Sequence, residues 1–310
     1  MSVIDVKNLT KDYGFGRGVF DISFHVEKGE VFGFLGPNGA GKSTTIRHLM
    51  GFSKPDSGKA QILGKESFSQ YSIVLRQVGY IPGKIALPAG LTGWEFIRME
   101  QKLKKSENDE LLTRLLKMFK LDPSGDTKRM SLGAKRKLAV VTAFMNDPEV
   151  LILDEPTSGL DPVAQETFIE YIRNEKKRGK TILLSSHIFS EVDATCDRIA
   201  IIKDGKIVSD FVADELRHAS QKNYRIVFDN AEQYSRFLEN QASFDRFKVI
   251  DRNQDENAIV ISIDDLYVND MINVLSEYSI HGFTHLKETL EDYFMKYYKE
   301  DKDFGGALTK

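Results

Sequence analysis

Cysteine is nearly absent from this chain. Cys196 is the only one among 310 residues, so an internal disulfide is impossible and a metal site built from cysteines is not expected. We also expect no metal site built from the six histidines. We therefore expect a protein suited to a reducing compartment such as the cytosol.

Long apolar runs and an excess of charge of one sign are also missing. No uninterrupted apolar run approaches the roughly 20 residues that a membrane helix needs. The opening sequence "MSVIDVKNLT" has neither the basic start nor the apolar stretch of a secretory signal. A formal net charge of −3 leaves no broad basic surface for a polyanion, and the basic run "KKRGK" at residues 176–180 is interpreted as a solvated helix end. We expect no nucleic acid partner, and contact with a membrane only through another protein.

Two regions of different texture follow each other along the chain. Residues 1–219 alternate stretches of helical period with short apolar runs, which are "EVFGFLG", "VLILD", "TILLSS" and "RIAIIK". This pattern predicts an α/β domain with a buried sheet. Residues 220–310 predict the order βαββαβ followed by a last helix. That order is the split βαβ arrangement of a small α+β, ferredoxin-like domain.

The stretch "VFGFLGPNGAGKST" has the order of strand, glycine-rich loop and helix start that a phosphate-binding loop requires. Its glycines allow backbone N–H groups to turn inward, and Lys42 brings its ammonium group to the β- and γ-phosphates. Ser43 is placed to ligate Mg²⁺. The complete spacing GxxxxGKS predicts an ATP-binding loop made of Gly36, Pro37, Asn38, Gly39, Ala40, Gly41, Lys42, Ser43 and Thr44.

A second apolar strand, within "EVLILDEP", ends in two adjacent carboxylates. An acidic pair after a strand is by itself more often surface charge. Together with a phosphate-binding loop, it predicts that Asp154 holds Mg²⁺ and that Glu155 polarises the attacking water.

With "GPNGAGKST" and "LDEPTSGLDP" in this order, residues 3 to 215 resemble the ATP-binding subunits of ABC transporters. The resemblance implies a P-loop ATPase domain with a RecA-like core, an antiparallel β subdomain and a helical subdomain. It also implies that Tyr13 stacks on adenine, that Asp161 in the D-loop "SGLD" helps join two copies, and that His187 hydrogen-bonds the γ-phosphate as a neutral donor. Without the resemblance, Tyr13 would be interpreted as packing and His187 as a structural hydrogen-bonding residue.

The signature motif of that family, LSGGQ, corresponds here to "MSLGA" at residues 130–134. Ser131 is a good N-cap and Gly133 lies in the first helical turn, so free N–H groups and the helix dipole favour an anion. Leu132 replaces a glycine, and we expect helical dihedral angles there because only positive φ would exclude leucine. The resemblance implies that this motif grips ATP held by the P-loop of a second subunit, either another copy or a related chain. A degenerate motif kept only for structure is the alternative.

After "QVGYIP" the glutamine that contacts the metal in this family is replaced by Gly83. Gln77 precedes the predicted strand instead of following it, so we do not assign that role to it. Ser43, phosphates and water remain as ligands of Mg²⁺. The segment between this loop and the signature resembles the helical insert that contacts membrane subunits, where Trp94 and Phe96 are interpreted mainly as core packing.

These features predict a peripheral ATPase at the cytoplasmic face of the cell membrane. The resemblance implies that it dimerises around two MgATP molecules and drives a separately encoded permease, of the ABC-2 exporter type that "SLGxK" signatures resemble. A soluble ABC-type clamp is the first alternative, opposed by the lack of a long heptad insertion and of positive charge. A slowly hydrolysing regulatory subunit is the second, and Gly83 and Leu132 keep it open.

Overall fold

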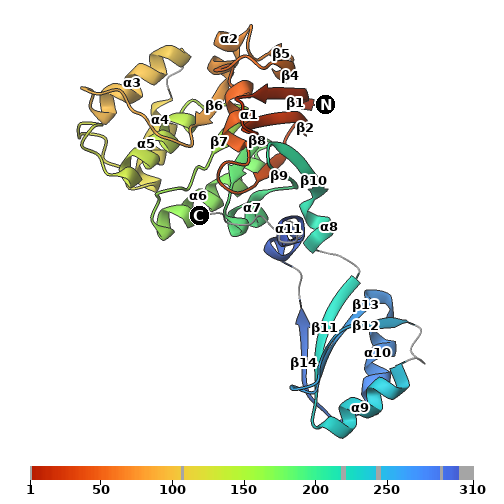
Figure 1. Cartoon of the computed structure of the whole chain (residues 1–310). Helices are drawn as coiled ribbons and strands as arrows, with labels where there is room; N and C mark the ends of the chain where they lie inside the picture. Colours follow the sequence, from red (N-terminus) through yellow and green to blue (C-terminus); the bar gives the residue numbers. More distant parts are fainter. Residues whose placement is uncertain (1, 106–107, 218–220, 242–245, 287–288, 300–310) are drawn as a thin grey trace, which may run out of the picture. The chain divides into compact units, whose positions relative to one another are not determined.

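The computed structural model describes residues 2–105, 108–217, 221–241, 246–286 and 289–299. The chain divides into two compact units, Met1–Ala213 and Asp214–Lys310 (Figure 1). The boundary expected between residues 219 and 220 lies outside the described residues.

A six-stranded sheet forms the centre of the first unit. Its spatial order is β10 (Lys206–Val212), β9 (Arg198–Lys203), β3 (Val31–Leu35), β8 (Thr181–Ser186), β7 (Val150–Asp154) and β6 (Val78–Ile81). Five of these strands are parallel, and β10 pairs antiparallel with β9. Every residue of β3, β7 and β8 is buried, which explains why these strands appear in the sequence as unbroken apolar runs. The expected α/β fold is confirmed.

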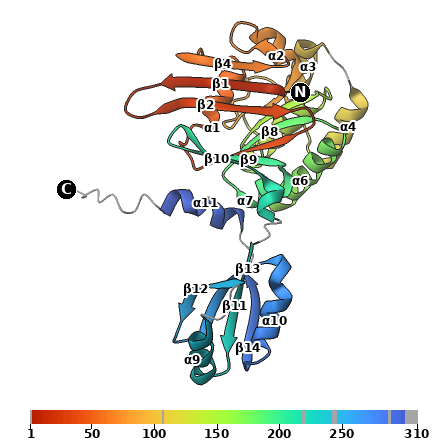
Figure 2. The ribbon, with the colours of Figure 1, turned by 90° about the vertical axis from the view of Figure 1, so that its right-hand side faces the viewer.

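A second, antiparallel sheet packs on the first. Its order is β2 (Gly18–Glu27), β1 (Ser2–Asp12), β4 (Ser57–Ile62) and β5 (Lys65–Glu66), and Figure 2 shows its long strands side by side. From Ile22 to Val26, β2 buries every second residue, so only one face of this stretch contacts the core. Phe24 of β2 stacks on Phe32 of β3 with ring centroids 5.1 Å apart, and this contact joins the two sheets.

Helices cover the sheets and form a separate group beside β6 (Figure 1). The helices of this unit are α1 (Lys42–Leu49), α2 (Tyr71–Gln77), α3 (Gly93–Lys104), α4 (Asp109–Met118), α5 (Leu132–Phe144), α6 (Pro162–Lys177) and α7 (Phe189–Thr195), and α8 (Ala213–Arg217) begins at its end. α3, α4 and α5 pack on one another and make up the expected helical subdomain. A capping box between Thr92 and Glu95 fixes the start of α3.

The second unit has the expected βαββαβ order. Its elements are β11 (Gln221–Phe228), α9 (Ala231–Asn240), β12 (Phe247–Asn253), β13 (Ala258–Asp264), a 3₁₀ turn (Asp265–Tyr267), α10 (Val268–Leu275), β14 (Ile280–Leu286) and α11 (Leu290–Lys299). The antiparallel sheet has the order β12-β13-β11-β14, in which β13 separates the two strands joined by α9. The ferredoxin-like arrangement is therefore confirmed. Among the described helices of both units, none is both long and apolar enough to cross a membrane.

Candidate nucleotide site

The loop between β3 and α1 has the geometry of a phosphate cradle. Gly39 and Gly41 have φ angles of 89° and 113°, which side chains disfavour. A Cβ atom at residue 36 would lie 2.6 Å from the carbonyl oxygen of Ile202, so this position is also restricted to glycine. α1 begins at Lys42, directly after the loop. The first N–H groups of the helix and the positive end of its dipole are thus directed at the loop, where they favour an anion.

Lys42 directly follows this loop, and its side chain is only 4% exposed. Its Nζ atom donates to the carbonyl of Gly36 at 2.6 Å and lies 3.0 Å from Oε1 of Glu155. A buried ammonium group needs such partners, because an unpaired charge is costly to remove from water. The structure therefore brings together the cation and the acid that the sequence predicts for one site.

The two acids follow the end of β7, where that strand pairs in parallel with β8. Asp154 is 3% exposed and accepts a hydrogen bond from Ser185 Oγ at 2.5 Å. Glu155 has a φ angle of 49°, an uncommon conformation for a residue other than glycine, and its N–H donates to the carbonyl of Ser185. The turn sends the two adjacent carboxylates in different directions. Strain of this kind is often found at functional sites.

His187 contacts Glu155 directly, with Nδ1 2.6 Å from Oε2. A carboxylate can only accept, so Nδ1 carries the hydrogen in this contact. A neutral ring then presents Nε2 as an acceptor. The expected donation from a neutral His187 to a γ-phosphate therefore requires that the ring first release Glu155.

The donors near Asp154 suit a hard cation such as Mg²⁺. Ser43 is exposed on the first turn of α1 and would offer one oxygen, and the carboxylate of Asp154 would offer a second. The described residues contain no cluster of three or more His, Cys, Asp or Glu side chains that could hold a metal by itself. The site thus fits an ion that takes most of its ligands from phosphate and water.

The signature segment forms a helix N-terminus, as expected. Ser131 is the N-cap of α5, and its hydroxyl accepts from the N–H of Ala134 at 3.1 Å. Leu132 is the first residue of the helix, so the expected helical conformation is confirmed. Asp161, in the D-loop, caps α6 and lies 3.2 Å from Lys137 of α5. The D-loop is therefore tied to the signature helix.

Comparisons with known proteins agree with this geometry. The family described as "ABC transporter" matches residues 19–158. The chain is 33% identical over 307 residues to the bacitracin transport ATP-binding protein BcrA of Bacillus licheniformis, covering 95% of this chain and 97% of that one. It belongs to the ABC transporter family. It is the ATP-binding subunit, which hydrolyses ATP and powers a separate permease.

Two further ABC proteins match about two thirds of the chain. The Nod factor export ATP-binding protein I of Burkholderia orbicola (strain AU 1054) is 37% identical over 212 residues, which are 67% of this chain and 70% of that one. A solved structure of an ATP-binding subunit of an ABC transporter has 33% identity and a TM-score of 0.65, covering 70% of this chain and 92% of that one.

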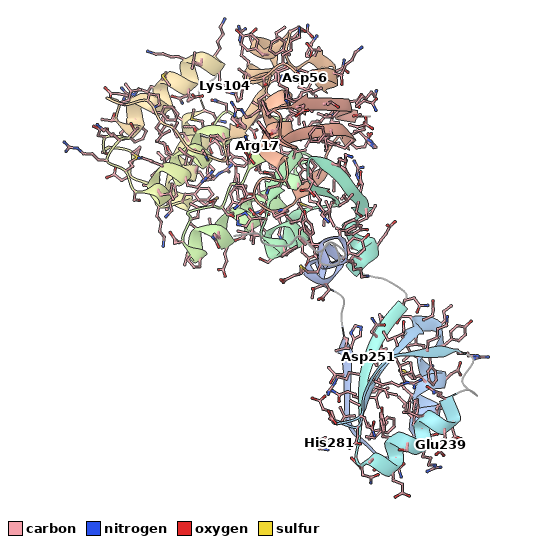
Figure 3. All side chains as sticks on the ribbon, in the orientation of Figure 1. Arg17, Asp56, Lys104, Glu239, Asp251 and His281 are labelled. Atoms are coloured by element: carbon pink, nitrogen blue, oxygen red, sulfur yellow. The ribbon has the colours of Figure 1, made fainter. Side chains whose placement is uncertain are left out.

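Tyr13 directly follows β1, and its side chain is 51% exposed. Its backbone N–H donates to the carbonyl of Arg17, a residue labelled in Figure 3. The strand after this hairpin loop lies against the P-loop, because a Cβ atom at Gly41 would come within 2.9 Å of Val19. Tyr13 is thus an exposed ring on a loop whose base contacts the phosphate cradle of this ABC subunit. Its stacking on adenine stays a prediction.

Two charged residues near this site were missed in the sequence. Arg136 of α5 is 2% exposed and donates hydrogen bonds to carbonyls in two loops. Glu191 of α7 is also 2% exposed and accepts from Ser186 Oγ at 2.6 Å. Burial raises the pKa of Glu191 to about 7, although hydrogen bonds from Ser186 and Thr157 oppose the shift. No local signal marks either residue, because each stands in an ordinary charged stretch of a helix.

Proposed function

We propose that this chain is the ATPase subunit of an ABC-2-type exporter and that two such subunits close around two MgATP molecules. The observation that carries the proposal is the contact of Lys42 and His187 with the two oxygens of Glu155, at the mouth of the P-loop. The signature helix and the D-loop, which the family resemblance places at the dimer contact, are both formed. The name of one relative, a Nod factor export ATP-binding protein, supports export as the direction of transport.

In this mechanism the phosphates of ATP take the place of Glu155 as the counter-charge of Lys42. Glu155 then orients the attacking water, and the nearby His187 holds the γ-phosphate region once it is released from that carboxylate. Ser43 and Asp154 would hold Mg²⁺, which neutralises charge on the phosphate oxygens when bound. Because Glu155 is close to where the γ-phosphate would lie, its negative charge also weakens ATP binding before hydrolysis.

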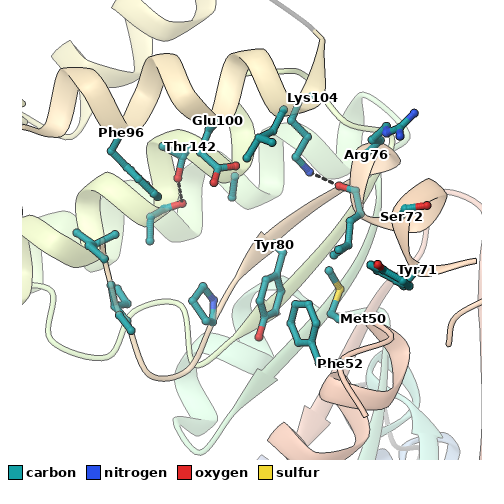
Figure 4. Close-up of a pocket in the computed structure, with 18 residues that line it drawn as sticks. Met50, Phe52, Tyr71, Ser72, Arg76, Tyr80, Phe96, Glu100, Lys104 and Thr142 are labelled. Carbon is teal, nitrogen blue, oxygen red and sulfur yellow. Dashed lines mark hydrogen bonds between the residues drawn. The ribbon is translucent and has the colours of Figure 1, made fainter. Parts of the chain in front are cut away.

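The permease is proposed to dock in an apolar cavity of about 430 Å³ between α3 and the rest of the unit (Figure 4). Phe96 and Glu100 of α3 lie on one wall, and Phe52 and Tyr80 lie opposite. Phe96 is 9% exposed, so it is packed as expected, and it also lines this cavity; Trp94 is 38% exposed. A helix of the permease inserted here would place the subunit at the cytoplasmic face of the membrane.

The test is Glu155→Gln, with Glu149→Gln as the matched control at an exposed carboxylate before β7. We expect Glu155→Gln to bind ATP at least as tightly as the wild type and to reduce turnover by about 100-fold or more, because a water-orienting carboxylate is lost. Size-exclusion chromatography with MgATP should show a stable dimer of the variant. Near wild-type turnover of Glu155→Gln would show that this assignment of the base is wrong.

A further inference from the structure

Arg136 is a buried cation that joins three carbonyl groups from two loops. Nε donates to the carbonyl of Ser158 in the D-loop, and the two terminal nitrogens donate to Pro82 and Gly83 in the loop after β6, each at 2.8 Å. A planar guanidinium can satisfy three acceptors in this way, whereas the compact ammonium group of lysine cannot reproduce its fork. The residue is therefore a clamp between the signature helix and both loops.

The loop that Arg136 holds lies directly against the metal acid. A Cβ atom at Gly83 would lie 2.7 Å from Oδ2 of Asp154, so the backbone of the loop packs too closely against this carboxylate to leave room for a side chain. Gly83 has no side chain with which to fix its own position. Its carbonyl bond to Arg136 is the contact that fixes the loop at this residue.

The charge of Arg136 also faces the acids of the site. The carboxylates of Asp154, Glu155 and Glu191 all interact with the guanidinium electrostatically. Burial lowers the pKa of Arg136 and these three acids oppose the shift, but arginine stays protonated at any physiological pH. Arg136 thus places a permanent positive charge near the carboxylates of Asp154 and Glu155.

We propose that Arg136 is a positioning residue for ATP hydrolysis, which holds the Pro82–Gly83 loop against Asp154 and the D-loop against the signature helix. The inference rests on the proposed roles of Asp154 and Glu155. Closure of the N-terminus of α5 on a phosphate of the second subunit would then move both loops with it. Since Pro82 also lines the cavity proposed for the permease, the same clamp connects that cavity to the acid pair.

The first test is Arg136→Lys in the full chain, which keeps the charge but loses the fork. We expect turnover to fall by about 10-fold to 100-fold, the scale for a displaced catalytic group. Affinity for ATP without Mg²⁺ should stay unchanged, because the P-loop is untouched, while the gain in affinity that Mg²⁺ gives should shrink. Arg173→Lys is the matched control, because Arg173 Nε donates to the carbonyl of Ala194 at 2.9 Å outside the site. The turnover of this variant should stay within about two-fold of the wild type.

A purely structural role predicts a different result. Turnover per folded molecule and the effect of Mg²⁺ on ATP affinity would then match the wild type, even where the melting temperature falls, and this result would overturn the proposal. If Arg136→Lys does not fold, Arg136→Gln retains two amide donors and is judged by the same criteria.

Gly83→Ala disturbs the same loop from its other side. If Arg136 acts through this loop, Gly83→Ala combined with Arg136→Lys should lose little more turnover than the worse single variant. Losses that multiply would contradict the proposal. Glu155→Gln in the same assay distinguishes the proposed function from the role of Arg136. If Glu155→Gln retains turnover, Glu155 is not the base. If Glu155→Gln loses turnover but Arg136→Lys retains it, only the proposed role of Arg136 is refuted.

Discussion

The two units of the chain bury different kinds of side chain. In the part of the chain that the structure describes, every buried polar or charged side chain lies between Lys42 and Thr195, in the first unit. The core of the second unit consists instead of hydrophobic residues on β11, β12, β13, α9 and α10, together with Tyr278 after α10. Burying a polar group is costly unless it is paired, and Lys42, Asp154 and Glu191 each have a hydrogen-bond partner within the first unit. The first unit thus buries the polar side chains of the nucleotide site, whereas the second unit buries side chains that form a hydrophobic core.

The largest expected effect tests the second half of this comparison. Phe237 of α9 is fully buried against Phe228 and Tyr278. Phe237→Ala should lower the free energy of unfolding of this unit by about 3–5 kcal/mol, since it leaves a cavity in an apolar core. Hydrogen exchange of β11 and β13 measures the loss.

Affinity for ATP should stay unchanged in Phe237→Ala, because the nucleotide site lies wholly in the first unit. Leu266→Ala is the control, since Leu266 is 83% exposed and its loss should cost less than about 0.5 kcal/mol. A variant Phe237→Ala that no longer binds ATP would show that the two units do not function separately.

The sequence predicts the element order of both units, and it predicts motifs better than contacts. Lys42 and Asp154 are found because a strand, a loop and a helix in fixed order determine where they lie. Arg136 is not found, because its burial depends on two loops that lie 53 and 22 residues away along the chain. The basic run at residues 176–180 shows the same limit. Its interpretation as solvated is wrong for Lys180, which is 7% exposed and donates to the carbonyls of Asp147 and Pro148.

The second prediction concerns Glu191, a buried acid in the first unit. Its pKa is raised from 4.5 to about 7, so the folded state binds this proton more tightly than the unfolded chain does. The stability that protonation provides is complete below about pH 4.5 and is lost as the pH rises through 7. Glu191→Gln should therefore gain stability relative to the wild type between pH 5 and 8, by about 3 kcal/mol at most.

Urea unfolding at pH 5 and at pH 8 measures the free energy of unfolding and so checks the prediction for Glu191. Glu170→Gln, at an exposed position of α6, is the control and should follow the wild type at both. A constant difference in stability between Glu191→Gln and the wild type over this range would mean that Glu191 is ionised in the folded protein throughout.

The third prediction separates a binding ring from a packed one. Tyr13→Ala should weaken ATP binding by about 1–3 kcal/mol, the scale of base stacking on an aromatic side chain, with little change in stability because the ring is half exposed. Phe15→Ala is the matched control, as Phe15 lies in the same hairpin loop and is 97% exposed. Titration with a fluorescent ATP analogue measures both. Equal affinity in Tyr13→Ala and the wild type would return Tyr13 to a packing role.

The smallest effect is expected at Leu132, where the sequence departs from the family signature. If α5 grips a phosphate through its backbone N–H groups, the side chain at its first position matters little, and Leu132 is 62% exposed. Leu132→Gly should therefore keep ATPase activity within a few-fold and cost about 1 kcal/mol or less of stability. Ser131→Arg should abolish activity, because it removes the cap and fills the anion site, while ATP binding to the monomer survives. A large loss of turnover in Leu132→Gly would instead assign a specific role to the leucine, whose side chain lies beside Gly159 of the D-loop.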